Sequence, residues 1–205
     1  MRKVKVGAAA LMLGLLALAA GVSAQAAEQQ GEMSAEQKAQ MEAWMKAMTP
    51  GAEHQRLAQG VGTWNATVTM WEAPGAPPQT SQAVAKRRMA LGGRVLVEEW
   101  TGMMMGMPFE GLGTSGYDNV AKRYWGTWND NMSTGIMTTT GSCDPDPAKG
   151  CTFVGEMVNM MTGKDDTVRE TVTWANPDEE RFQMFGKGPD GKEYRMMEIV
   201  AKRAK

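Results

Sequence analysis

Methionine is the residue type that stands out in this sequence, with 20 occurrences among 205 residues. The densest group is Met103-Met104-Met105-Gly106-Met107, and further methionine pairs follow towards the C-terminus. Thioether sulfurs bind Cu(I) where about three converge, and they also react with oxidants and adapt to irregular apolar cavities. The only histidine, His54, lies outside the methionine-rich segments, so no histidine accompanies them as a copper ligand. The pattern leaves open a Cu(I)- or redox-handling protein, but it favours apolar packing or an apolar ligand surface, so we predict no cofactor or metal.

Two acidic residues, Glu98 and Glu99, could carry acid or base chemistry. Neighbouring residues of a strand point to opposite faces, so only one of them can point inward and the two cannot form a catalytic pair. An uncharacterised enzyme that uses an inward carboxylate such as Glu99 remains an alternative. His54 has no accompanying nucleophile motif such as G-x-S-x-G, and we interpret it as a residue that caps or packs a helix. No catalytic residue is predicted.

The segment from Gly111 to Gly116 has the spacing G-x-G-x-x-G of dinucleotide-binding loops. A phosphate-binding loop of this kind lies between a strand and a helix. Here the residues after it, Tyr117-Asp118-Asn119, indicate a turn, and 122–129 alternate like another strand. We therefore interpret these glycines as strand positions that allow bending and close packing.

The chain has two cysteines, Cys143 and Cys151, on either side of a segment rich in Asp, Pro and Gly. In an oxidising compartment this arrangement predicts a disulfide bond. The alternative, a metal site with two thiolates, lacks supporting histidines.

The N-terminus predicts export. Arg2, Lys3 and Lys5 precede an apolar run at 7–20, and Ala24-Gln25-Ala26 has the small-x-small pattern of a cleavage site. The alternative is a membrane anchor, but the run is short for a span of about 20 residues. We predict a signal peptide at 1–26 and a periplasmic or secreted product.

Charge and hydropathy exclude two functional classes of protein. With 22 Lys+Arg against 23 Asp+Glu and no basic block after the first five residues, the sequence lacks the charge pattern of a nucleic-acid-binding protein. No later apolar stretch is long enough to span a membrane as a helix. We predict a helical segment at 27–59 and a single antiparallel β-domain at 60–205.

Periodicity supports this division. Ser34 and Gln37 form a capping box, apolar residues follow at helical spacing up to Met48, and a second short helix is predicted at 52–59. From Gly62 the pattern alternates between tight turns. The predicted strands are 63–71, 79–91, 94–102, 108–117, 122–129, 134–142, 151–160, 165–175, 181–187 and 193–202. Consecutive hairpins without intervening helices predict a mainly β fold, an antiparallel up-and-down barrel of about eight to ten strands.

Aromatic residues on these strands could line a cavity. Trp64 and Trp128 occupy matched positions in Gly-Thr-Trp motifs and each shares a face with apolar or small residues. They could fill the barrel base as core, or contact a ligand. The candidate ligand-contacting residues are Trp64, Trp100, Trp128, Met103, Met104, Met105 and Glu99.

Several motifs occur in a characteristic order: Pro50-Gly51-Ala52-Glu53-His54-Gln55-Arg56-Leu57, Val61-Gly62-Thr63-Trp64, Leu91-Gly92-Gly93-Arg94, Pro108-Phe109-Glu110-Gly111, Gly116-Tyr117-Asp118-Asn119 and 126–135. Together they resemble domain of unknown function family 1579, a group of bacterial calycin-like proteins. The resemblance implies a small antiparallel barrel with an internal cavity, as in lipocalins, fatty-acid-binding proteins and nitrobindins, and it implies no reaction. Nitrobindins hold haem through a histidine near the C-terminal strands, and this chain has no histidine after His54.

The leading functional interpretation is a binding or structural module whose barrel holds a small apolar ligand. The loop at 102–108 is apolar yet rich in turn residues, which is consistent with a portal that faces the helix carrying Met41 and Trp44. The alternative is that this loop packs under that helix as part of the core.

Overall fold

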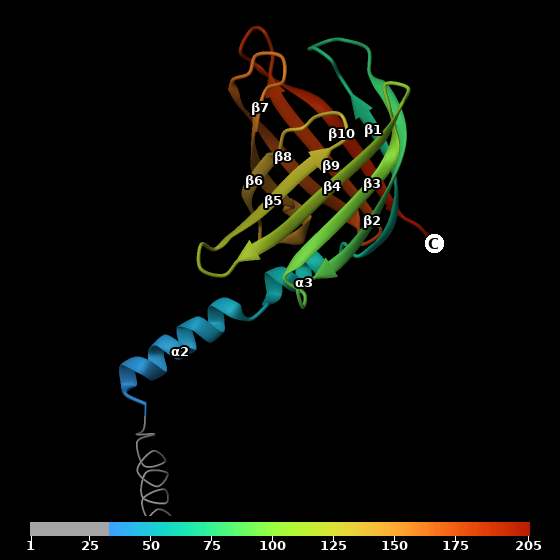
Figure 1. The fold of residues 1–205 in the computed structure, drawn as a ribbon. Helices are drawn as coiled ribbons and strands as arrows, with labels where there is room; N and C mark the ends of the chain where they lie inside the picture. The colour runs from blue at the N-terminus through green and yellow to red at the C-terminus, as the bar shows by residue number, and fades with distance from the viewer. Residues whose placement is uncertain (1–32) are drawn as a thin grey trace, which may run out of the picture. The chain divides into compact units, whose positions relative to one another are not determined.

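The computed structural model describes residues 33–205, so the predicted signal peptide lies outside the described residues. Across the described part, helices α2 (Ala35–Met48) and α3 (Ala52–Ala58) precede ten strands, with one 3-10 turn at Pro147–Lys149 (Figure 1). The strands are β1 (Gly62–Met70), β2 (Gln79–Ala90), β3 (Val95–Met104), β4 (Met107–Asp118), β5 (Arg123–Asp130), β6 (Met137–Cys143), β7 (Cys151–Val158), β8 (Asp165–Asn176), β9 (Glu179–Lys187) and β10 (Glu193–Arg203).

The strands form a closed barrel in which each strand pairs antiparallel with the next and β1 pairs with β10. The predicted fold class is therefore confirmed, at the upper end of the predicted strand number. An open sheet would leave the outer side of its first and last strands without hydrogen-bond partners. Closure into a barrel removes these two free edges. We call the end that carries α3 and the turn at 91–94 the base, and the opposite end, with the turn at 105–106, the mouth (Figure 1).

Helix α2 begins and ends as the sequence predicts, and α3 ends at Ala58, one residue before its predicted end. The Ser34 hydroxyl accepts from the Gln37 N–H at 3.1 Å, and the Gln37 side chain accepts from the Ser34 N–H at 2.9 Å, which confirms the capping box. The chain divides into two compact units between Lys46 and Ala47, so α3 belongs to the barrel unit, where it contacts β3 and β4. No helix within residues 33–205 is long and apolar enough to cross a membrane.

The glycines between 111 and 116 are strand positions, as predicted, because these residues lie within β4 and the next element is strand β5. A Cβ atom at Gly111 would lie 2.5 Å from the Trp128 ring. The bare backbone at this position therefore makes room for the indole on the neighbouring strand.

The predicted disulfide bond joins Cys143 and Cys151, which are paired residues of β6 and β7 at the base. The loop that it closes also contacts α3, because the Arg56 guanidinium donates to the Asp144 carbonyl at 2.9 Å. The disulfide therefore fixes the part of the base on which α3 rests.

Removing this disulfide is expected to lower the free energy of unfolding by about 2.5 kcal/mol, because the unfolded chain regains the entropy of an open loop. Urea denaturation of a Cys143→Ser/Cys151→Ser variant measures the loss. Wild-type protein unfolded with a reductant serves as the control and should show the same decrease. Equal stability of the reduced and oxidised proteins would contradict the prediction.

Candidate functional site

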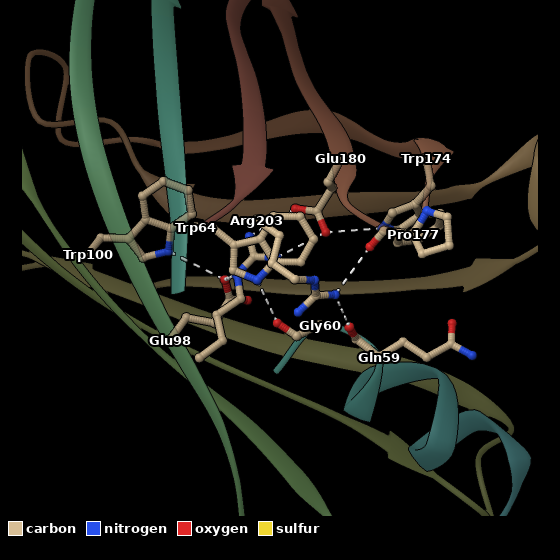
Figure 2. Close-up of polar contacts among 10 residues, drawn as sticks. Gln59, Gly60, Trp64, Glu98, Trp100, Trp174, Pro177, Glu180 and Arg203 are labelled. Carbon is tan, nitrogen blue, oxygen red and sulfur yellow. Dashed lines mark hydrogen bonds and ion pairs between the residues drawn. The ribbon is translucent and has the colours of Figure 1, made fainter. Parts of the chain in front are cut away.

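Arg87 lies at the centre of a buried charge cluster at the base, whose acidic members, Glu98 and Glu180, are labelled in Figure 2. Its side chain projects inward from β2, where it is only 7% exposed. Its two terminal nitrogens lie 3.0 and 2.9 Å from the Glu180 carboxylate, and its Nε lies 2.8 Å from Glu98. Burial alone would lower the pKa of Arg87, but the two carboxylates outweigh it and raise that pKa above its ordinary value.

Tryptophan side chains complete this cluster. The indole of Trp100 donates to Glu98 at 3.4 Å, and that of Trp174 donates to Glu180 at 3.2 Å. The guanidinium carbon of Arg87 also lies 5.2 Å from the centre of the Trp64 ring. Both carboxylates are thus held by a cation and by an N–H group, so the cluster fixes the strands in place and offers no free acid or base.

Arg203, at the end of β10, closes the base below Trp64. Its guanidinium carbon lies 4.3 Å from the centre of the Trp64 ring. The Trp64 indole donates to the Gly60 carbonyl at 2.8 Å. The remaining partners of Arg203 are the carbonyls of Gln59, Val61 and Pro177 and the Asp178 carboxylate. Figure 2 shows the bonds to Gln59 and Pro177. These bonds fasten the segment between α3 and β1 to the barrel.

His54 has the structural role that the sequence predicts. It is 5% exposed, and its Nδ1 accepts from the Gly51 N–H at 3.1 Å at the start of α3. One residue earlier, Glu53 accepts a hydrogen bond from the Tyr124 hydroxyl on β5. Burial, together with this bond to Glu53, raises the pKa of Tyr124. α3 is therefore attached to the base by its own side chains.

The inner surface of the barrel changes character away from this base. Trp64, Ala66 and Ala201 are each 1% exposed, which indicates close packing. Further towards the mouth, inward-facing side chains of β8, β9 and β10 are only half-buried: Val172, Phe182, Met184, Met197 and Ile199. The sheet itself screens these side chains from the outside, so their accessible surface faces the interior or the mouth. The interior is less completely filled along β8, β9 and β10 than at the base.

Glu170 lies on this part of the wall, at the middle of β8. It is 5% exposed, and its neighbours across the sheet are Phe153 on β7 and Met184 on β9. Among the described residues, no group is hydrogen-bonded to its Oε1 atom. Burial raises the pKa of Glu170 from its ordinary 4.5 to about 7.

The three predicted tryptophans all face the interior. Trp64 and Trp100 belong to the buried core, and Trp128 packs against that core while remaining half-buried. The Trp128 ring lies 6.3 Å from those of Trp100 and Phe109, and its indole donates to Asp130 at 2.9 Å. The structure thus brings these residues together, with Trp64 and Trp100 buried and Trp128 half-buried, and their contact with a ligand stays a prediction.

The predicted inward position of Glu99 is wrong. It is exposed, and the inward carboxylate of this pair is Glu98, which pairs across the sheet with the buried Arg87. The alternation was recognised correctly, but its phase depends on which side of β3 meets the core. Because Glu98 is already bound to Arg87, the pair supplies no free inward carboxylate.

The predicted methionine residues lie at the mouth. Met103 and Met105 are 49% and 67% exposed, and Met104 is half-buried. With Met70 and residues 79–82, the turn at 103–106 lines an open hollow of about 710 Å³. The last residues of α2 are bound at the base instead, where Arg94 donates to the Met48 carbonyl at 2.7 Å. The portal itself stays a prediction.

Sequence reasoning missed Arg87, Glu170 and Glu180. A signal was present, because Glu170 interrupts the apolar face formed by Val168, Val172 and Trp174 on alternate positions. A charged residue on an otherwise buried face indicates either a paired structural charge or a binding group.

Comparison with known proteins supports the fold. Residues 49–203 match the family described as "Protein of unknown function (DUF1579)". A search of the curated proteins found no match. Among solved structures, Rv2717c from M. tuberculosis is 14% identical with a TM-score of 0.55, covering 77% of this chain and 100% of that chain. The S-type phycobiliprotein lyase CPES from Guillardia theta is 12% identical with a TM-score of 0.53, covering 79% and 97%. At these identities the similarity establishes the barrel fold alone.

Proposed function

We propose that this chain, which belongs to the DUF1579 family of proteins of unknown function, is exported and binds a small, largely apolar molecule inside its barrel. Export rests on the leader at 1–26, and the mass of the secreted protein should correspond to a chain that begins at residue 27. The binding role rests on the barrel wall.

The observation that carries the binding proposal is the contrast in burial between the two parts of the interior. Trp64 and Ala85 are 1% and 0% exposed, whereas Met197 and Ile199 pack against the same core and remain half-buried. Apolar side chains that keep accessible surface inside a closed sheet favour an apolar occupant, since covering this surface is worth about 25 cal/mol per Å². Barrels of this size hold one small ligand in the same way.

Filling the interior is expected to weaken binding. We expect diphenylhexatriene, an apolar fluorescent probe, to bind the wild-type protein, and Ile199→Trp to weaken its affinity at least about tenfold by occupying the interior. Val200→Trp is the matched control, because Val200 lies on the outer face of the same strand, and its affinity should stay within about twofold of wild type. Fluorescence titration measures both.

Two results would contradict this proposal. One is the absence of probe binding to the wild-type protein. The other is an Ile199→Trp variant that fails to fold, since an added ring that finds no room indicates a filled core.

A second candidate, Cu(I) binding, is favoured by a row of methionines across the inner wall. Met70, Met197 and Met184 are successive partners on β1, β10 and β9. Soft thioethers at neighbouring positions suit Cu(I). We expect protein purified from copper-supplemented cells to carry less than about one tenth of a copper atom per chain if the apolar ligand is correct. Metal analysis that finds one copper per chain, and its loss in Met184→Leu, would favour the metal instead.

A further inference from the structure

We propose that the interior site selects cationic amphiphiles, molecules with an apolar body and one ammonium group, by pairing that group with the Glu170 carboxylate. This inference rests on the interior ligand site proposed above and names the chemistry of its occupant.

The first support is the position of Glu170. It faces inward from the middle of β8, is 5% exposed, and has an Oε1 atom without a hydrogen-bond partner among the described residues. A buried carboxyl group without a partner is unfavourable and rare in native proteins. A cation in the interior would supply the missing partner.

The second support is that no arginine at the base is bound to Glu170 among the described residues. Arg87 is bound to Glu98 and Glu180, and Arg203 is bound to Asp178 and to backbone carbonyls. Arg56 donates to the Asp144 carbonyl and lies over the Trp174 ring. A cationic ligand would therefore supply the partner that these side chains do not.

The third support is the surroundings of Glu170, which suit an organic cation better than an anion. Phe153 is its direct neighbour on β7, and an aromatic ring attracts an alkylammonium group. A Cβ atom at Gly155 would lie 3.5 Å from the Glu170 Oε1 and 3.2 Å from the Met137 sulfur, so the neighbouring strand offers no polar side chain to the carboxyl group at this position. A fatty acid would instead bring a second negative charge to a buried carboxylate.

Displacement of bound diphenylhexatriene by chain-matched competitors tests this selectivity. The competitors are dodecylamine, dodecanol and dodecanoate, each used at pH 8 and below its micelle concentration. We expect dodecylamine to displace the probe from the wild-type protein at a concentration about tenfold lower than dodecanol, and dodecanoate to be the weakest competitor.

Substitutions of Glu170 test whether its carboxylate causes the preference for the amine over the alcohol. In Glu170→Gln, the amine and the alcohol should compete within about twofold of each other. Glu170→Leu removes the polar group and should give the same loss of preference if the amide variant folds poorly. Glu99→Gln, an exposed glutamate on β3, is the matched control and should keep the tenfold preference.

The possible failures are distinguishable. If the wild-type protein does not bind diphenylhexatriene, the interior ligand site and the cation preference are both wrong. If the probe binds but the three competitors act alike, or if the preference survives in Glu170→Gln and Glu170→Leu, the interior site stands and the cation proposal is overturned.

Discussion

Replacing Arg87 with methionine is expected to lower the free energy of unfolding by about 3–5 kcal/mol. The cause is the pair of carboxylates left behind, because Glu98 and Glu180 would remain at the base without the cation that now binds both. Urea denaturation at pH 7 measures this loss. The defect should diminish as the pH falls, since protonation removes the uncompensated negative charges.

Two further variants isolate the charge effect. Arg88→Met changes the next residue, which is exposed on the outer face, and should alter stability by less than about 0.5 kcal/mol. Adding Glu98→Gln and Glu180→Gln to Arg87→Met should restore part of the lost stability, because no buried charge remains. If Arg87→Met costs no more than Arg88→Met, the cluster does not hold the base together.

Glu170→Gln is expected to increase stability at pH 8 by up to about 3 kcal/mol and to leave it nearly unchanged at pH 4.5. The pKa of Glu170 is raised from 4.5 to about 7, so the folded state holds a proton that the unfolded state releases within this range. Wild-type stability therefore falls as the pH rises from about 4.5 through about 7. The glutamine variant cannot ionise and should lack this decrease.

Melting temperatures recorded between pH 4 and pH 8 check this prediction. Glu99→Gln is the control, because the side chain of Glu99 is exposed, and it should follow the wild-type pH profile. A wild-type profile that is flat between pH 5 and pH 7, or one that Glu170→Gln leaves unchanged, would show that Glu170 is not held in an apolar environment.

Local patterns were sufficient to predict the fold. Strict alternation identified each strand, and turn residues such as Gly92 and Gly93, both at positive φ, marked the boundaries between strands. The disulfide was equally accessible, because Cys143 and Cys151 flank a single turn. Such features depend only on residues that are close in the sequence.

The candidate site was less accessible because its contacts are distant in the sequence. Arg87 and Glu180 are 93 positions apart, and no local pattern indicates that they meet. Alternation showed that Glu98 and Glu99 face opposite ways, but only the pairing of β2 with β3 shows which one meets Arg87. For Glu170, the sequence shows a charge on an apolar face, while its lack of a partner depends on every strand around it.

The pairing of β1 with β10 has a consequence for synthesis and quality control. Trp64, at the start of the barrel, pairs with Arg203 on β10, which follows it by 139 positions (203 − 64). The ring of hydrogen bonds therefore cannot close until β10 has been synthesised, and a contact of such long sequence separation forms slowly. A chain that ends before β10 would expose the edges of β1 and β9, which can pair with other polypeptides. β10 thus separates a closed barrel from a species prone to aggregate, so proteolysis within β10 would harm this protein far more than cleavage ahead of Ala47.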